Sequence, residues 1–185
     1  MNTVRSRLAI GAIALASIVP VEAFDLQGHR GARGLLPENT LASFGKALDI
    51  GVTTLETDLA VTKDGVLVIS HDPDLHPALV RGPSGFWLTA RGPSIRTLTL
   101  AELKTLRAKE RLPMLRKANM AYDGQFEIPT FEEIILLAKA KEKEAGRPIG
   151  IYPETKHPTY FSSIGLPHEA PLLATLEKHG YTGKD

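Results

Sequence analysis

Short apolar runs that end in polar residues alternate with stretches of helical periodicity along the chain. The apolar runs predict strands at 55–59, 66–70 and 149–152, and the run at 24–26 predicts a first strand that ends at the His29-Arg30 pair. Apolar positions with helical spacing predict helices at 41–50, 100–109, 131–145 and 168–179. Strands followed by helices are typical of an α/β protein whose strands run largely parallel.

Capping signals indicate where three of the predicted helices begin. Asn39 or Thr40 can cap the helix at 41–50. Thr-x-x-Glu capping boxes precede the next two helices, at 99–102 and 130–133. A glycine follows the first helix at position 51, and another follows the third at position 146, so we expect both helices to stop there.

One pair of predicted strands leaves no room for a helix between them. The Asp64-Gly65 dipeptide, a tight-turn signal, separates the strands at 55–59 and 66–70. The alternation of strands and helices is therefore interrupted here. The segment that follows, 73–128, begins rich in glycine and proline, and we expect it to be an insertion. Its Phe86 and Trp87 are expected either to contact a lid or to form a small core of their own.

The first 23 residues have the features of a secretory signal peptide. Arg5 and Arg7 precede an apolar run at 8–19, and small residues follow at the positions that a signal peptidase reads. The run is too short to span a membrane, although an uncleaved anchor is the alternative. Cleavage after Ala23 would place the mature domain, 24–185, in the periplasm, with secretion from the cell as the alternative.

The composition narrows the class of partner. Removing 23 of the 185 residues leaves 162, with 20 basic and 20 acidic side chains. A net charge of zero argues against nucleic acid as the main partner. The sequence contains no cysteine, so we expect neither a lipid-anchored lipoprotein nor a disulfide framework. An apolar content of 43% over the whole chain suits one packed globular domain.

A histidine and an arginine follow the first predicted strand. His29 and Arg30 stand at the start of a glycine-rich run that leads into the helix at 41–50. A proton-transfer group next to a fixed cation suits an anionic, phosphorylated substrate. A glycine-rich turn with a surface histidine is the competing interpretation of the same residues.

Two carboxylates lie two residues apart on the second predicted strand. Side chains at i and i+2 of a strand share a face, so Glu56 and Asp58 point one way while Leu55, Thr57 and Leu59 point the other. Two unpaired carboxylates on one buried face would repel each other and take up protons unless a cation lay between them. Oxygen ligands of this kind select Ca²⁺ or Mg²⁺.

These motifs, in this order and spacing, resemble the glycerophosphodiester phosphodiesterase family. They are His-Arg-Gly at 29–31, Pro-Glu-Asn-Thr at 37–40, Glu-x-Asp at 56–58, Asp-Gly at 64–65 and His-Asp at 71–72. The resemblance covers about 24–180 and is to periplasmic or secreted bacterial members. It implies an α/β fold of the (β/α)8 TIM-barrel type, distorted after the second strand, with functional residues at the carboxyl ends of the strands.

Glu154 and Lys156 follow the strand predicted at 149–152, and they again share a face. From the residues alone, a plain ion pair is the simpler interpretation, and such a pair contributes little when exposed. The resemblance implies instead that Glu154 joins Glu56 and Asp58 in holding one divalent cation, Ca²⁺ or alternatively Mg²⁺. It also implies that Lys156 contacts phosphate.

The resemblance further implies metal-dependent hydrolysis of glycerophosphodiesters to an alcohol and sn-glycerol 3-phosphate. In this interpretation His29 and His71 act as general base and general acid, and Arg30 binds the phosphodiester. Glu38 and Asn39 would orient these residues or simply start the helix at 41–50.

Length is the main departure from the family. A (β/α)8 barrel usually takes about 250 residues, whereas this sequence of 185 residues predicts about four strands. We therefore expect the N-terminal half of a phosphodiesterase, with a barrel that is incomplete at its C-terminal end. The strand edges and helix faces that such a half-barrel exposes would favour self-association.

Two other functions compete with the diesterase. A lipid phosphodiesterase or lyase of the sphingomyelinase D type can share paired histidines and an acidic metal site, but the Glu154-x-Lys156 motif favours the diesterase. The second competing function is that of an inactive, truncated phosphate-binding module. The presence of every motif residue argues against this module, and the missing half argues for it.

Overall fold

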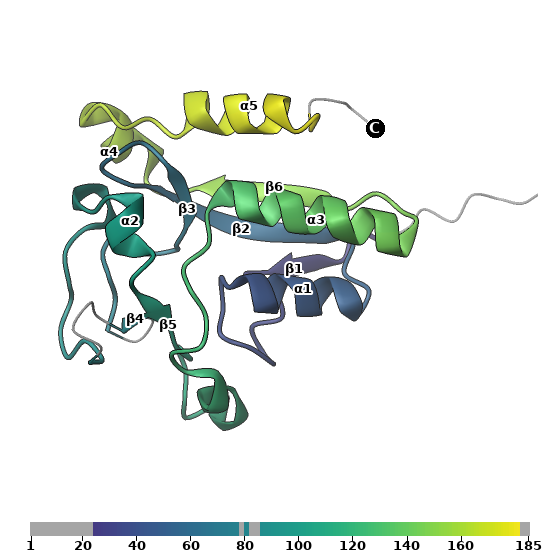
Figure 1. Cartoon of the computed structure of the whole chain (residues 1–185), viewed down its shortest axis with the longest axis horizontal. Helices are drawn as coiled ribbons and strands as arrows, with labels where there is room; N and C mark the ends of the chain where they lie inside the picture. The colour runs from purple at the N-terminus through teal and green to yellow at the C-terminus, as the bar shows by residue number, and fades with distance from the viewer. Residues whose placement is uncertain (1–23, 78–79, 82–85, 182–185) are drawn as a thin grey trace, which may run out of the picture.

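The computed structural model describes residues 24–77, 80–81 and 86–181, and its centre is a sheet built on one long strand (Figure 1). This strand, β2 (Thr54–Val61), pairs in parallel with β1 (Gln27–His29) on one side and with β6 (Gly150–Thr155) on the other. β3 (Leu67–Ile69) runs antiparallel to the end of β2. The predicted interruption of the strand–helix alternation is therefore a β-hairpin.

Two helices cover one face of this sheet. α1 (Leu41–Asp49) and α3 (Phe131–Ala145) lie side by side, and both contact the sheet (Figure 1). The core between the helices and the sheet includes the fully buried side chains of Phe44, Leu55, Leu59, Phe131 and Ile134. Leu55 and Leu59 thus occupy the face of β2 opposite to the face expected for Glu56 and Asp58.

The ends of α3 follow the capping signals in the sequence. The Thr130 hydroxyl accepts a hydrogen bond from the backbone of Glu133, whose carboxylate accepts one from the Thr130 N–H. Gly146 closes the helix in the left-handed conformation, with φ of 64°. Both bounds are as predicted. At α1, Thr40 provides the cap, whereas Asn39 directs its side chain elsewhere.

The segment 73–128 contains short elements around a second apolar cluster. These elements are β4 (Val80–Arg81) and β5 (Arg107–Ala108), which pair with each other, α2 (Leu100–Leu103), and the 3-10 helices η1 (Ile95–Thr97) and η2 (Lys117–Tyr122). The cluster joins the segment to the β2–β3 hairpin through buried side chains of Ala60, Val68, Leu75, Ile95, Leu103, Leu106 and Ile128.

The helix predicted at 100–109 is wrong beyond its first turn. α2 ends at Leu103, and the chain then extends into β5. Leaving the helix here lets Leu106 pack in the second cluster while 107–108 pair with β4. Phe86 and Trp87 form no small core, because they are 77% and 37% exposed.

In the described part of the chain, two helices follow β6. α5 (Glu169–Lys178) is one residue shorter at each end than predicted. α4 (Pro158–Ser163) was not predicted; it starts after His157, which has φ of 52°, and its Phe161 is fully buried. None of the helices in the described part of the chain combines the length and apolarity needed to cross a membrane. The predicted signal peptide, 1–23, lies outside the described residues.

Candidate active site

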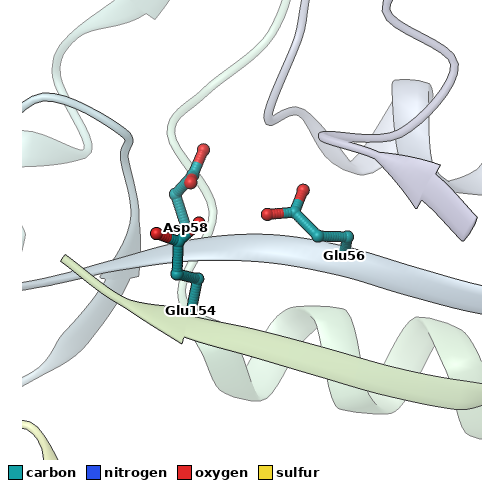
Figure 2. Close-up of side chains that lie close together, drawn as sticks. All are labelled: Glu56, Asp58 and Glu154. Atoms are coloured by element: carbon teal, nitrogen blue, oxygen red, sulfur yellow. The ribbon is translucent and has the colours of Figure 1, made fainter.

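The candidate site lies at the carboxyl ends of the parallel strands, where barrel enzymes place their functional residues. In the ladder, His29 of β1 pairs with Glu56 of β2, and Asp58 of β2 pairs with Glu154 of β6. Figure 2 shows the carboxylates of Glu56 and Asp58 on β2, with Glu154 reaching towards them from β6. The alternation of side chains along β2 places the first two opposite the face that packs on α1 and α3.

The three carboxylates form a group that can hold a cation. One oxygen from each of Glu56, Asp58 and Glu154 lies within 4.8 Å of the other two. Burial, followed by the charge of Asp58, raises the pKa of Glu56. Asp58 is fully buried, and its Oδ1 accepts no hydrogen bond although Lys156 Nζ lies 3.2 Å away. The buried carboxylates of Glu56 and Asp58 repel each other, and Asp58 keeps one oxygen without a hydrogen bond, so they fit a divalent cation that the exposed Glu154 can also contact.

The His-Arg-Gly turn ties β1 to these carboxylates. Arg30 has a φ of 57°, and its backbone N–H donates to Glu56 Oε2 at 3.0 Å. In its guanidinium, Nε lies 3.0 Å from Asp58 Oδ2 and Nη1 donates to Glu38 Oε1 at 3.1 Å. At Gly31, with φ of 80°, a Cβ atom would lie 2.6 Å from the backbone of α1. The turn therefore needs glycine at this position.

Lys156 supplies a second positive charge. Its Nζ lies 2.7 Å from Glu154 Oε1 and 3.2 Å from Asp58 Oδ1. Burial alone lowers the pKa of Lys156, but its hydrogen bond to Glu154 and the charge of Asp58 outweigh burial and raise that pKa. Lys156 therefore stays protonated. Together with Arg30 it gives the site two fixed cations, which can bind an anionic group.

His29 lies at the end of β1, next to Glu56. Its Nε2 lies 3.8 Å from Glu56 Oε2, too far for a hydrogen bond, and about half of its side chain is exposed. Partial burial, followed by the positive charges of Arg33 and Arg30, lowers the pKa of His29. The ring is therefore neutral at neutral pH, the form that a general base requires.

His71 lies at the end of the hairpin, next to Asp72. Its Nδ1 lies 3.1 Å from Asp72 Oδ1. The ring also lines a small cavity of about 30 Å³ that Glu38 and Asn39 line from the β1–α1 loop. The structure thus brings the His-Asp pair next to the Pro-Glu-Asn-Thr motif.

Glu38 and Asn39 of the Pro-Glu-Asn-Thr motif contact the site, whereas Thr40 caps α1. Asn39 has a φ of 58°, its Nδ2 donates to Asp58 Oδ2 at 3.2 Å, and its N–H donates to the carbonyl of Arg30 at 3.0 Å. Glu38 is buried and accepts the hydrogen bond from Arg30. Both side chains contact residues of the site, so the start of α1 is left to Thr40.

Residues 29–180 match the model of the glycerophosphoryl diester phosphodiesterase family. The chain belongs to this family. A glycerophosphodiester phosphodiesterase of Arabidopsis thaliana is 36% identical over 171 residues, and one of Haemophilus influenzae is 35% identical over 167 residues. Each match covers 84% of this chain but 44% and 46% of the respective relative. The chain thus spans about half the length of the curated relatives it matches.

Solved structures of phosphodiesterases share the fold. A putative glycerophosphoryl diester phosphodiesterase from Silicibacter pomeroyi superposes with a TM-score of 0.72 at 29% identity, covering 84% of this chain and 54% of that chain. An Oleispira antarctica phosphodiesterase in complex with the product sn-glycerol-3-phosphate superposes with a TM-score of 0.56 at 26% identity, covering 84% and 52%. The likeness confirms the α/β barrel class, and β1, β2 and β6 form part of the parallel barrel wall.

The candidate site also includes a contact that the motifs did not indicate. Arg111, from the segment 73–128, forms ion pairs with Glu38 and Asp72. It belongs to none of the motifs and lies 73 positions after Glu38. No local pattern could have marked it, because the contact exists only once the segment has folded against the β1–α1 loop.

Proposed function

We propose that this chain carries the metal- and phosphate-binding side of a glycerophosphodiester phosphodiesterase active site. The reaction is the hydrolysis of a glycerophosphodiester to an alcohol and sn-glycerol 3-phosphate. The proposal rests on the meeting of three carboxylates and two cationic side chains at the ends of β1, β2 and β6. The Oleispira antarctica structure, solved with sn-glycerol-3-phosphate as product, supports this substrate class. Membership of the family does not favour the sphingomyelinase D alternative.

In this proposal Glu56, Asp58 and Glu154 hold one divalent cation. Ca²⁺ is preferred because it accepts irregular sets of oxygen ligands, whereas Mg²⁺, the alternative, demands near-octahedral geometry. A bound cation supplies positive charge next to the phosphodiester oxygens. Arg30 and Lys156 contact the same phosphodiester and stabilise the negative charge that develops on its oxygens.

His29 and His71 move the protons. His29 takes the proton from a glycerol hydroxyl of the substrate, and that oxygen attacks phosphorus. The P–O bond to the alcohol breaks, and the alcohol leaves with a proton from His71. Water then opens the cyclic phosphate while the two histidines exchange roles. The lowered pKa of His29 supports its role as the first base, and the contact of Asp72 with His71 Nδ1 leaves Nε2 to face the substrate.

We also propose that the domain 24–185, with the segment 73–128 as its insertion, acts in the periplasm after removal of the signal peptide 1–23. The charge and apolar pattern of those first 23 residues supports export. N-terminal sequencing of the protein from a periplasmic extract tests the proposal, and we expect the mature chain to begin at Phe24. A chain that keeps Met1 would contradict cleavage.

Hydrolysis of glycerophosphocholine by the purified chain tests the function. We expect sn-glycerol 3-phosphate with Ca²⁺, less with Mg²⁺ and none with EDTA. Glu56→Gln removes one ligand at constant size and abolishes release, whereas Glu144→Gln, at an exposed surface pair, does not. Metal binding without product, from folded protein, would instead support a phosphate-binding module. Turnover of sphingomyelin alone would overturn the substrate assignment.

A further inference from the structure

Arg111 connects two motif carboxylates from different parts of the chain, the buried Glu38 and the partly buried Asp72. Its Nη1 donates to Glu38 Oε1 at 3.1 Å, and its Nη2 lies 3.4 Å from Asp72 Oδ2. Glu38 precedes α1 and Asp72 follows β3. One planar guanidinium thus pairs with two carboxylates, in surroundings where water screens charge only weakly.

Each of these carboxylates also contacts a residue of the site. Glu38 Oε1 accepts a hydrogen bond from Arg30 Nη1 at 3.1 Å, and Asp72 Oδ1 lies 3.1 Å from His71 Nδ1. Burial alone raises the pKa of Asp72, but the bond to His71 and the charge of Arg111 outweigh burial and lower that pKa. Arg111 therefore helps to keep ionised the carboxylate that faces His71.

A buried network holds the backbone next to Arg111 in place. The carboxylate of Glu110 is buried, lies 3.1 Å from Arg116 Nη1 and accepts a hydrogen bond from Asn119 Nδ2 at 2.8 Å. Arg116 and Asn119 both donate to the carbonyl of Arg33, at 2.9 and 3.2 Å. Arg33 belongs to the same β1–α1 loop as Arg30. The network therefore fixes Arg111 relative to that loop before any substrate binds.

We propose that Arg111 is a positioning residue for the phosphodiesterase reaction, orienting His71 through Asp72 and Arg30 through Glu38. This inference rests on the proposed function. Through its two ion pairs, Arg111 acts on both the proton-transfer side and the phosphate-binding side of the site. A small error in the placement of reacting groups slows the chemical step far more than it weakens binding.

Kinetics with glycerophosphocholine test the inference. We expect Arg111→Gln to lower kcat about 10- to 100-fold while KM changes less than about threefold. Arg111→Lys should be intermediate, because an ammonium lacks the planar fork that pairs with two carboxylates. Guanidinium ion at millimolar concentration should partly restore Arg111→Ala. The matched control is Arg91→Gln, which removes an exposed arginine paired with Asp74 and should behave as the wild type.

A second readout needs no turnover. Carbon-13 NMR titration of the Asp72 carboxyl group reports the pKa of Asp72 directly. We expect Arg111→Gln to raise this pKa and Arg91→Gln to leave it unchanged. If the wild-type chain releases no product, the proposed function fails, while a raised pKa still supports the action of Arg111 on Asp72.

Three results would overturn the inference. The first is an unchanged pKa of Asp72 in folded Arg111→Gln. The second is a wild-type kcat in that variant, and the third is a higher KM at unchanged kcat, which would make Arg111 a binding residue only. If Arg111→Gln does not fold, Arg111→Lys decides, and a wild-type kcat there overturns the inference.

Discussion

Lys156 and a divalent cation would compete for the same carboxylate oxygens. The Nζ of Lys156 lies 3.2 Å from Asp58 Oδ1 and 2.7 Å from Glu154 Oε1. Lys156→Met removes the charge and keeps an unbranched side chain. We expect this variant to bind Ca²⁺ about tenfold more tightly, because a competing positive charge is gone. We also expect slower turnover, because a phosphate contact is lost. Calorimetric titration gives the affinity, and release of sn-glycerol 3-phosphate gives the rate.

Lys141 offers the matched control for that experiment. Its Nζ also joins two carboxylates, at 3.0 Å from Asp49 and 2.7 Å from Glu144, but on the outer surface of α1 and α3. Lys141→Met should leave both the Ca²⁺ affinity and the rate unchanged. Weaker Ca²⁺ binding in Lys156→Met would contradict competition at the three-carboxylate group.

Substitution of either histidine of the site should reduce activity strongly and change stability little. We expect His29→Ala and His71→Ala each to lower kcat about 10²- to 10⁴-fold, the usual contribution of a general acid or base. Because about half of the His29 side chain is exposed, its removal should change the free energy of unfolding by no more than about 0.5 kcal/mol.

Urea unfolding and the product assay measure the two effects. His157→Asn serves as the control, since asparagine tolerates the left-handed conformation of this exposed neighbour of Lys156. A wild-type rate in His29→Ala would remove His29 from the mechanism.

At the scale of elements, α3 depends on its caps. Thr130→Ala removes a buried cap and should cost about 1 kcal/mol of unfolding free energy, up to about 2. Thr99→Ala should cost less, because α2 is four residues long and its capping box is exposed. Urea denaturation of both variants measures the difference, and equal losses would contradict a special role for the α3 cap.

The observed bounds of α3, α2 and α4 show which helices can be predicted from the sequence. The bounds of α3 follow from Thr130, Glu133 and Gly146, which act within the helix itself. The early end of α2 depends instead on where Leu106 packs, and this requires the β2–β3 hairpin. α4 escaped prediction because its apolar anchor is a single buried phenylalanine in a six-residue helix, too short for a periodic pattern.

The packing of α4 against α5 contains a buried histidine. His168 precedes α5, is fully buried and lies edge-to-face on Phe161, with ring centroids 4.6 Å apart. Burial lowers the pKa of His168, and the nearby charge of Glu169 offsets this only in part. Below a pH of about 6.5 this histidine takes up a proton in the unfolded chain but not in the folded chain. The free energy of unfolding therefore decreases as the pH decreases.

We therefore expect the free energy of unfolding to decrease from pH 6.5 to 5.5. His168→Phe should flatten this part of the curve, because phenylalanine keeps the ring contact and cannot titrate. Urea denaturation at pH 7.5, 6.5 and 5.5 measures the slope. An unchanged slope in His168→Phe would assign the effect to another group.

At the scale of the whole molecule, the site divides into a predictable and an unpredictable part. The shared face of Glu56 and Asp58 follows from strand periodicity alone. The approach of Glu154 follows from the parallel pairing of β6 with β2, for which the sequence offered only the family resemblance. Arg111 could not be predicted, because its contacts require the whole segment 73–128 to fold onto the β1–α1 loop.

Metal binding links the site to the stability of the whole chain. Without a cation, Glu56 is buried beside Asp58, and burial followed by that charge raises the pKa of Glu56. The usual pKa of a glutamate carboxyl is 4.5, and the pKa of Glu56 in the folded chain is higher. The folded state therefore becomes less stable, relative to the unfolded state, as the pH rises from 4.5 through the folded-state pKa. At neutral pH the ionised Glu56 is therefore unfavourable until a cation binds.

Glu56→Gln removes both this cost and a metal ligand, so its two effects have opposite signs. In EDTA at pH 7 we expect the variant to have a higher Tm than the wild type. With Ca²⁺ at a hundred times its Kd the wild type should gain about 2.7 kcal/mol, and the variant should gain far less. Scanning calorimetry with EDTA and with Ca²⁺ measures both, with Glu144→Gln expected to match the wild type. An equal gain in Glu56→Gln and the wild type would place the cation away from the three carboxylates.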